Sequence, residues 1–275
     1  MNHETAAVMK SLRFGIEIET NGLRVETITR ILAGIEGCGG WKAVHDGSLS
    51  GGTYSGEVVS PILTYGDLEK VQAIVRKLRE NGATVDTSTG IHIHVDGSSF
   101  SAQQLLNLGN LISKEEKLIH AMLNIHANRL RYCGTIDPNF VARLRSKRTI
   151  NKEDVNAAWY GRHVSMPSRY DSSRYRGLNL NSYFYRGTIE FRYFNGTLHA
   201  GEVKAYIQFA LALATKALTS KSVSKVTRVF DETNERYSAR VLMHSLDLQG
   251  DEFKTARHHL SNHLRGPAQL KRAAA

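Results

Sequence analysis

The sequence predicts an α+β fold with a largely antiparallel sheet, and three observations lead to this class. Residues 14–20, 90–96 and 188–194 each alternate apolar and polar side chains, which is the period of a half-buried strand. Segments with apolar residues at helical spacing separate these strands and differ in length. Arg186-Gly187 stands between two strand-like runs and indicates a hairpin. Strands mixed irregularly with helices, one pair in a hairpin, are typical of an α+β protein.

The first half of the chain predicts three strands and three helices. In chain order these are a strand over 14–20, a short helix over 27–35, a strand over 56–62, a helix over 67–81, a strand over 90–96 and a helix over 101–125. Pro61 ends the second strand because proline cannot donate to a strand ladder. The helix over 67–81 has a one-sided apolar stripe, with Asp67 as N-cap and Gly82 just past its end. Ser101 caps the helix that follows.

The second half begins with a basic, irregular segment and ends in helices. The expected elements are a helix near 152–160, strands over 178–185 and 188–194, the most apolar helix over 201–218, and two helices near 234–246 and 251–264. Gly266-Pro267 ends the last helix, because neither residue continues a helix easily.

Composition and length restrict the class of protein. The chain has 275 residues, of which 41% are hydrophobic and 23% charged, and these fractions argue against a largely disordered chain. Cys38 and Cys133 lack CxxC spacing, which excludes a disulfide framework and a cysteine zinc site. The first 13 residues have no apolar run behind a basic start, and the longest apolar stretch, 206–218, is too short to span a bilayer. We therefore expect a cytoplasmic protein with no membrane partner.

The net charge of +10 is concentrated in the middle of the chain. Residues 129–176 hold 11 basic and 4 acidic side chains, whereas residues 1–128 hold 11 basic and 14 acidic ones. The basic segment implies an anionic partner such as nucleic acid, nucleotide phosphates or an acidic substrate; a solvated basic loop is the alternative. Its arginines are scattered among glycine, proline and serine, so we expect a nucleotide or an anionic substrate rather than duplex DNA.

The alternation places titratable side chains on one face of each of the three strands. On the first strand these are Glu17 and Glu19, on the second His92 and His94, and on the third Glu190 and Arg192. The same count puts Phe194 on this polar face. Clustered carboxylates repel one another, and divalent cations remove that repulsion most simply. Glu57 from a strand and Asp46 from a loop could join the cluster. Together the strands predict a metal or phosphate site.

Each pair has a plainer interpretation when it is taken alone. A Glu-x-Glu pair is usually a solvated face, and Glu190-x-Arg192 is most often a same-face ion pair. A His-x-His pair directs two imidazoles at one point, as zinc and iron sites do, but an ordinary half-buried pair is at least as frequent. The sequence has no GxGxxG, GxxxxGK[ST] or GxSxG motif, so the dinucleotide-binding, P-loop and serine-hydrolase signatures are absent.

Six motifs follow one another in a recognisable order. They are Phe14-Gly15-Ile16-Glu17-Ile18-Glu19, Trp41…Asp46-Gly47-Ser48-Leu49, Gly56-Glu57-Val58-Val59-Ser60-Pro61, Gly90-Ile91-His92-Ile93-His94-Val95, Arg129-x-x-Tyr132, and Asn179…Thr188-Ile189-Glu190-Phe191-Arg192-Tyr193-Phe194. This order resembles the amidoligase family, carboxylate–amine ligases related to glutamate–cysteine ligase and glutamine synthetase. The resemblance spans about residues 12–220. We therefore expect one catalytic domain over 1–275, with a helical extension over 221–275.

The resemblance implies a curved antiparallel sheet with helices on its convex face, as in glutamine synthetase and glutamate–cysteine ligase. Its concave face would hold ATP and two or three Mg²⁺ ions. Carried over by motif, the metal ligands would be Glu17, Glu19, Asp46, Glu57, His94 and Glu190. Arg192, Arg129 and Ser60 would contact the nucleotide, and Glu190 and Arg192 would be the catalytic pair. Because Mg²⁺ prefers oxygen ligands, His92 or His94 could instead bind phosphate or substrate.

The resemblance also implies the reaction. ATP would phosphorylate the carboxylate of a small molecule or peptide, and an amine acceptor would attack the acyl phosphate to form an amide or isopeptide bond. Two other functions stay open: a zinc or manganese hydrolase using His92 and His94, and a basic nucleic-acid-binding protein using residues 129–176. The excess of carboxylates argues against the hydrolase. A nucleic-acid binder leaves the acidic strand face without a purpose, and we expect no sequence-specific nucleic acid.

Overall fold

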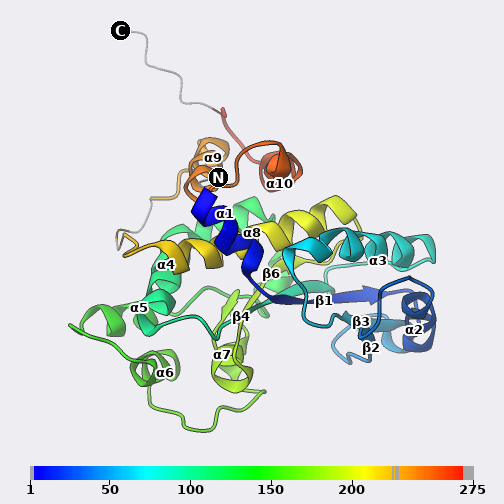
Figure 1. The fold of residues 1–275 in the computed structure, drawn as a ribbon, viewed down its shortest axis with the longest axis horizontal. Coiled ribbons are helices and arrows are strands. Elements are labelled where there is room, and N and C mark those ends of the chain that lie inside the picture. The colour runs from blue at the N-terminus through cyan, green and yellow to red at the C-terminus, as the bar shows by residue number, and fades with distance from the viewer. Residues whose placement is uncertain (1–2, 225, 227–228, 269–275) are drawn as a thin grey trace.

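A six-stranded antiparallel sheet forms the centre of the protein in a computed structural model that describes residues 3–224, 226 and 229–268 (Figure 1). The strand order is β2-β3-β1-β4-β6-β5, and each neighbouring pair runs antiparallel. The strands are β1 (Phe14–Asn21), β2 (Lys42–Val44), β3 (Ser55–Val59), β4 (Gly90–Asp96), β5 (Leu178–Asn179) and β6 (Thr188–Asn195). The α+β class with a largely antiparallel sheet is therefore confirmed.

Helices lie on both sides of this sheet. The helices are α1 (His3–Ser11), α2 (Val25–Ala33), α3 (Leu68–Glu80), α4 (Ala102–Met122), α5 (Pro138–Arg145), α6 (Lys152–Tyr160), α7 (Asn181–Arg186), α8 (Ala200–Thr219), α9 (Glu235–Ser245) and α10 (Lys254–Ser261). Helix α8 packs on β4 and contacts α1, α3, α4 and α10. Figure 1 shows α3, α4 and α8 on one side of the strands and α6 and α7 on the other.

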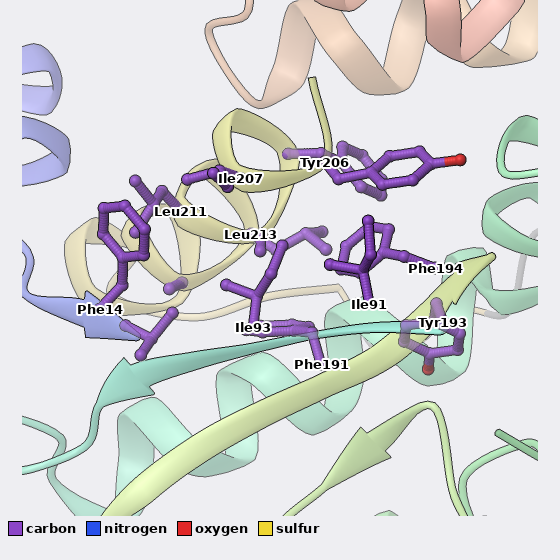
Figure 2. Packing of buried hydrophobic residues seen from close by; sticks show 14 of the residues in the cluster. Phe14, Ile91, Ile93, Phe191, Tyr193, Phe194, Tyr206, Ile207, Leu211 and Leu213 are labelled. Carbon is purple, nitrogen blue, oxygen red and sulfur yellow. The ribbon is translucent and has the colours of Figure 1, made fainter. Parts of the chain in front are cut away.

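The apolar face of the sheet and helix α8 form the core. Ile91 and Ile93 of β4 and Phe191 of β6 are fully buried, and Figure 2 shows them facing Leu211 and Leu213 of α8. Burying a side chain of this size contributes about 1.5–3 kcal/mol. Since successive strand residues point to opposite faces, the same strands can fill the core with one face and hold polar groups on the other.

Strand β6 departs from simple alternation at one point. Ile93 pairs with Phe191 but Ile91 pairs with Phe194, so β6 has two residues where β4 has one. This β-bulge returns Phe194 to the helical face, where its ring stacks on Tyr206 of α8 with centroids 4.7 Å apart (Figure 2). The prediction that Phe194 lies on the polar face is therefore wrong, because counting in twos does not detect an inserted residue.

Residues 178–185 form mostly helix, which corrects the predicted hairpin. Strand β5 has only two residues, Leu178 and Asn179, and both pair with β6. Helix α7 follows and ends at Gly187, which has a φ of 82°. Glycine adopts this left-handed conformation without a Cβ clash and so commonly ends helices. The glycine that indicated a tight turn is thus a helix C-cap.

The remaining predictions differ from the structure mainly at the ends of elements. The predicted helices over 67–81, 101–125, 152–160 and 201–218 are confirmed to within three residues at each end. The strand expected over 56–62 already ends at Val59. Helices α1 and α5 and the short strand β2 were not predicted. Among the described residues, no helix is both long and apolar enough to cross a membrane.

A buried carboxyl group ties β6 to helix α4. Glu116 accepts a hydrogen bond of 2.7 Å from the Tyr193 hydroxyl and bonds of 3.0 Å from the backbone N–H of Ile136. Burial raises the pKa of Glu116 to about 7, even though these donors lower it. The folded state therefore holds a proton on this group in a range where an exposed glutamate is ionised.

We expect Glu116→Gln to flatten the pH dependence of stability. Because the folded pKa lies above the unfolded one, the wild-type free energy of unfolding should fall as pH rises from 4.5 through 7. The free energy of unfolding of the variant, minus that of the wild type, should grow by roughly 2–3 kcal/mol between pH 5 and pH 8. Urea unfolding at several pH values measures it. Parallel pH profiles in the two proteins would contradict the expectation.

Candidate active site

The sheet register brings the predicted polar residues together on one face. The directly opposed pairs are Glu19 with Glu57, Glu17 with His92, and His94 with Glu190. Opposed side chains on one face have Cβ atoms about 4.5–5.5 Å apart, so these pairs form one continuous patch. With Asp46 from the loop after β2, they form what we call the acidic cluster: Glu17, Glu19, Asp46, Glu57, His92, His94 and Glu190.

Glu17 lies at the middle of this cluster. Its Oε2 is 3.2 Å from His94 Nε2 and 3.3 Å from His92 Nδ1. His94 Nε2 is also 3.8 Å from Glu190 Oε1, and His92 Nε2 is 3.8 Å from Glu19 Oε1. The two imidazoles of β4 thus stand between carboxylates of the two neighbouring strands, β1 and β6.

The loop after β2 contributes to the other end of the cluster. Asp46 is half-buried, and its carboxylate lies with those of Glu19 and Glu57 in a group whose ligand atoms are all within 4.8 Å of one another. One oxygen of Asp46 accepts hydrogen bonds of 2.8 Å from the N–H and the hydroxyl of Ser48. These bonds fix the loop carboxylate beside the strand carboxylates.

Among the residues that the structure describes, three overlapping sets of side chains could hold metal ions. They are Glu17–Glu57–His92, Glu17–His94–Glu190 and Glu19–Asp46–Glu57, and in each set the ligand atoms lie within 4.8 Å of one another. Every set is dominated by carboxylate oxygens, which hard cations such as Mg²⁺ prefer. None of these three sets contains both imidazoles. The donor chemistry therefore fits oxygen-preferring divalent cations better than a two-histidine zinc site.

Protonation keeps the cluster from carrying its full negative charge. Burial, and next the carboxylates of Glu17, Glu19, Asp46 and Glu190, raise the pKa of Glu57 to about 9. Burial also raises the pKa of Glu19. Burial acts in the same direction on Glu17, but His94 and His92 outweigh it and hold the pKa of Glu17 well below its usual value. A bound cation would replace the proton on Glu57.

Arg192 and Arg129, two of the arginines predicted for the site, adjoin the cluster. Arg192 Nη1 lies 2.7 Å from Glu190 Oε1, and the other oxygen of Glu190 accepts a bond of 2.6 Å from Asn179 Nδ2. Burial opposes ionisation of Glu190, but Arg192 and the two histidines lower the pKa of its carboxyl group. Arg129 is only 2% exposed and donates from Nη1 to Thr89 O at 2.7 Å.

Gly90 makes room for the Arg129 guanidinium. A Cβ at this position would stand 2.2 Å from Arg129 Nη2. This distance is too short for any side chain, so only glycine fits here. Glu19 Oε2 also accepts a hydrogen bond of 2.5 Å from the Gly90 N–H. The absent side chain thus lets a buried positive charge approach the Glu19 end of the acidic cluster.

Ser60 lies at the edge of the site, away from most of the cluster. Its hydroxyl accepts a hydrogen bond of 2.8 Å from the Ile16 N–H and donates one of 2.7 Å to Pro61 O. It lines a cavity of about 960 Å³ that also reaches Glu17 and His94. Residues 152–167 and helix α7 form much of the opposite wall.

Sequence reasoning missed two polar side chains in this region. Asn179, which belongs to one of the motifs but received no role, is buried and binds Glu190. Arg186, interpreted as a turn residue, reaches Glu17 Oε1 at 3.2 Å. Only the helical conformation of residues 181–186 directs Arg186 to the sheet, and no strand-like pattern reveals it.

The fold and this site describe an antiparallel sheet with one acidic face whose side chains could hold metal ions. The family model described as "Putative amidoligase enzyme" matches residues 10–214, which is well over half of the sequence. The chain belongs to this amidoligase family, as the motifs predicted. Membership of this family supports, in general terms, a ligase of the carboxylate–amine kind.

Among the solved structures that are similar to this chain, one matches nearly all of its length. It is described as a bifunctional glutathione synthetase from Pasteurella multocida, with 11% sequence identity and a TM-score of 0.41. The similarity covers 94% of this chain and 48% of that chain, so this chain spans about half the length of the synthetase. No curated protein matches the sequence.

We expect Mn²⁺ binding at pH 7.5 to release about one more proton from the wild type than from Glu57→Gln, because a cation would displace the proton that Glu57 holds. Calorimetry in two buffers of different ionisation enthalpy counts the protons. Glu153→Gln removes an exposed carboxylate outside the acidic cluster and is the matched control. Equal proton release by all three proteins would show that Glu57 is not a metal-linked proton carrier.

Proposed function

We propose that the protein is an ATP-dependent carboxylate–amine ligase that works through an acyl phosphate with two or three Mg²⁺ ions. The observation that supports this best is the meeting of five carboxylates with Arg192 and Arg129 on one sheet face. Phosphoryl transfer to a carboxylate brings anions together, so it depends on positioning and on neutralising charge. A site that combines cation ligands with buried guanidinium groups meets both needs.

The proposed reaction has two steps. An oxygen of the substrate carboxylate attacks the γ-phosphorus of ATP. The bond between this phosphorus and the β,γ-bridging oxygen breaks, and ADP leaves. The amine nitrogen then attacks the acyl carbon, inorganic phosphate leaves with the carboxylate oxygen, and the nitrogen loses a proton. The products are an amide or isopeptide, ADP and phosphate. Acyl phosphates react with water, so the second step requires that the amine reach the site before water does.

The acidic cluster would hold the metal ions. Glu17, Glu19, Asp46, Glu57 and Glu190 supply hard oxygen donors, and His94 belongs to one of the three sets. When bound, Mg²⁺ would neutralise part of the negative charge of the triphosphate. His92 contacts both Glu17 and Glu19, so we propose that it positions these two ligands. It is also a member of the Glu17–Glu57–His92 set.

The three predicted nucleotide contacts differ in how well the geometry supports them. The Arg192 side chain is 15% exposed, and we propose that it offers its planar donors to a transferring phosphoryl group. We propose that buried Arg129 acts as a fixed positive charge behind Glu19, without direct contact. The Ser60 hydroxyl already donates its proton to Pro61 O, so it has none for a phosphate oxygen, and we propose a structural role.

Formation of ADP tests the proposal. Purified protein with Mg²⁺, ATP and a panel of amino acids, dicarboxylates and amines should release ADP only when a carboxylate and an amine are both suitable, with the amide detected by mass.

Nucleotide binding should require Mg²⁺ or Mn²⁺, because the acidic cluster repels a bare triphosphate. Equal ATP affinity in EDTA would contradict the proposal. An equimolar zinc ion that survives purification would favour the hydrolase.

We expect Glu190→Gln and Arg192→Lys to fail in different ways. Loss of the Glu190 charge should weaken metal binding, and excess Mg²⁺ should partly restore the rate. Arg192→Lys keeps the charge but loses the planar fork, so it should keep metal and ATP binding while turnover falls by roughly 10². Ligation rates over a Mg²⁺ titration separate the two effects. Thermal melting checks that both variants are folded, and near-normal rates in both would rule out this site.

A further inference from the structure

Arg186 takes the place of a cation at the centre of the acidic cluster. It is the last residue of α7, directly before Gly187 and strand β6. Its Nη2 lies 3.2 Å from Glu17 Oε1, and 2.8 Å and 2.6 Å from the two ring nitrogens of His94. The proposed chemistry gives this side chain no role.

The atoms that Arg186 approaches belong to a metal-binding set. Glu17 and His94 are two of the three members of the Glu17–His94–Glu190 set. A guanidinium carries a permanent positive charge and cannot give it up by losing a proton at neutral pH. Two cations within a few ångströms repel strongly, so Arg186 and a divalent ion cannot both contact Glu17 and His94 at low energy.

Arg186 is more exposed than the other two arginines of the site. Its side chain is 43% exposed, compared with 15% for Arg192. Apart from Glu17 and His94, its hydrogen-bonded contact is from Nε to Ser182 Oγ at 3.1 Å. It also lines the cavity of about 960 Å³, so a rotation of its flexible chain leads into open space.

We propose that Arg186 is a displaceable counter-ion of the metal site. Without metal it neutralises Glu17 and covers His94, which limits repulsion among the carboxylates. A divalent ion that binds to Glu17 and His94 expels the guanidinium into the cavity. Arg186 and the metal therefore compete, and the metal affinity is lower than the ligand set alone would give. The proposal rests on the metal role within the proposed function, and it is independent of ATP use and of ligation.

Mn²⁺ binding without nucleotide tests this competition, with free Mn²⁺ measured by electron paramagnetic resonance. Arg186→Ala should bind Mn²⁺ roughly 5- to 100-fold more tightly than wild type, the usual range for coupling between two binding events. Arg186→Lys keeps the charge and should lie between the two proteins. Thermal melting in EDTA should show Arg186→Ala to be folded and less stable than the wild type, because its carboxylates lose a counter-ion.

The matched control is Arg13→Ala. Arg13 lines the same cavity but pairs with Asp96, so its loss removes one positive charge from the cavity without touching Glu17. Its Mn²⁺ affinity should change less than twofold. Unchanged or weaker binding by Arg186→Ala, or an equal gain in Arg13→Ala, would overturn the proposal. If the ligase assay fails but Arg186→Ala still binds Mn²⁺ more tightly than wild type, the result would count against the proposed function alone.

Discussion

Repulsion between carboxylates on one sheet face is the constraint on which the rest of this structure depends. Five carboxyl groups converge there, and burial together with the four neighbouring carboxylates raises the pKa of Glu57 to about 9. Three sets of contacts reduce that repulsion. The imidazoles of His92 and His94 lie against Glu17, Arg192 forms an ion pair with Glu190, and Arg186 forms one with Glu17. Burying a carboxylate without a partner costs several kcal/mol of folding free energy. The rest of the fold must therefore offset the cost of this face.

The stabilisation comes from the opposite face of the same strands. β1, β4 and β6 place apolar side chains against α8, and α8 is itself covered by α1, α3, α4 and α10. The polar face therefore lies on the central strands of the sheet, where both neighbours fix the backbone by hydrogen bonds. A ligand set on such strands is held more rigidly than one on loops, which suits chemistry that depends on aligning two anions.

The sequence allowed the two faces to be predicted, but not the way the strands meet. Period-two alternation places Glu17, His92 and Glu190 on one side of their own strands, and this prediction needs no knowledge of the neighbours. Register depends on which strands pair and on bulges, so the misplacement of Phe194 followed from counting alone. The helix at 181–186 was hidden because its aromatic residues suit a strand equally well. For that reason the contact of Arg186 with Glu17 could not be foreseen.

The bulge in β6 links the site to the core. Without the extra residue, a strand that presents Glu190 and Arg192 to the cluster would present Phe194 on the polar face too. The inserted residue instead leaves Arg192 on the polar side and returns Phe194 to Tyr206. Tyr193, the second residue of the bulge, reaches Glu116 in α4, so the irregular point is itself fixed by a buried hydrogen bond. A local break in the strand period therefore lets one strand position Arg192 beside Glu190 and still complete the core.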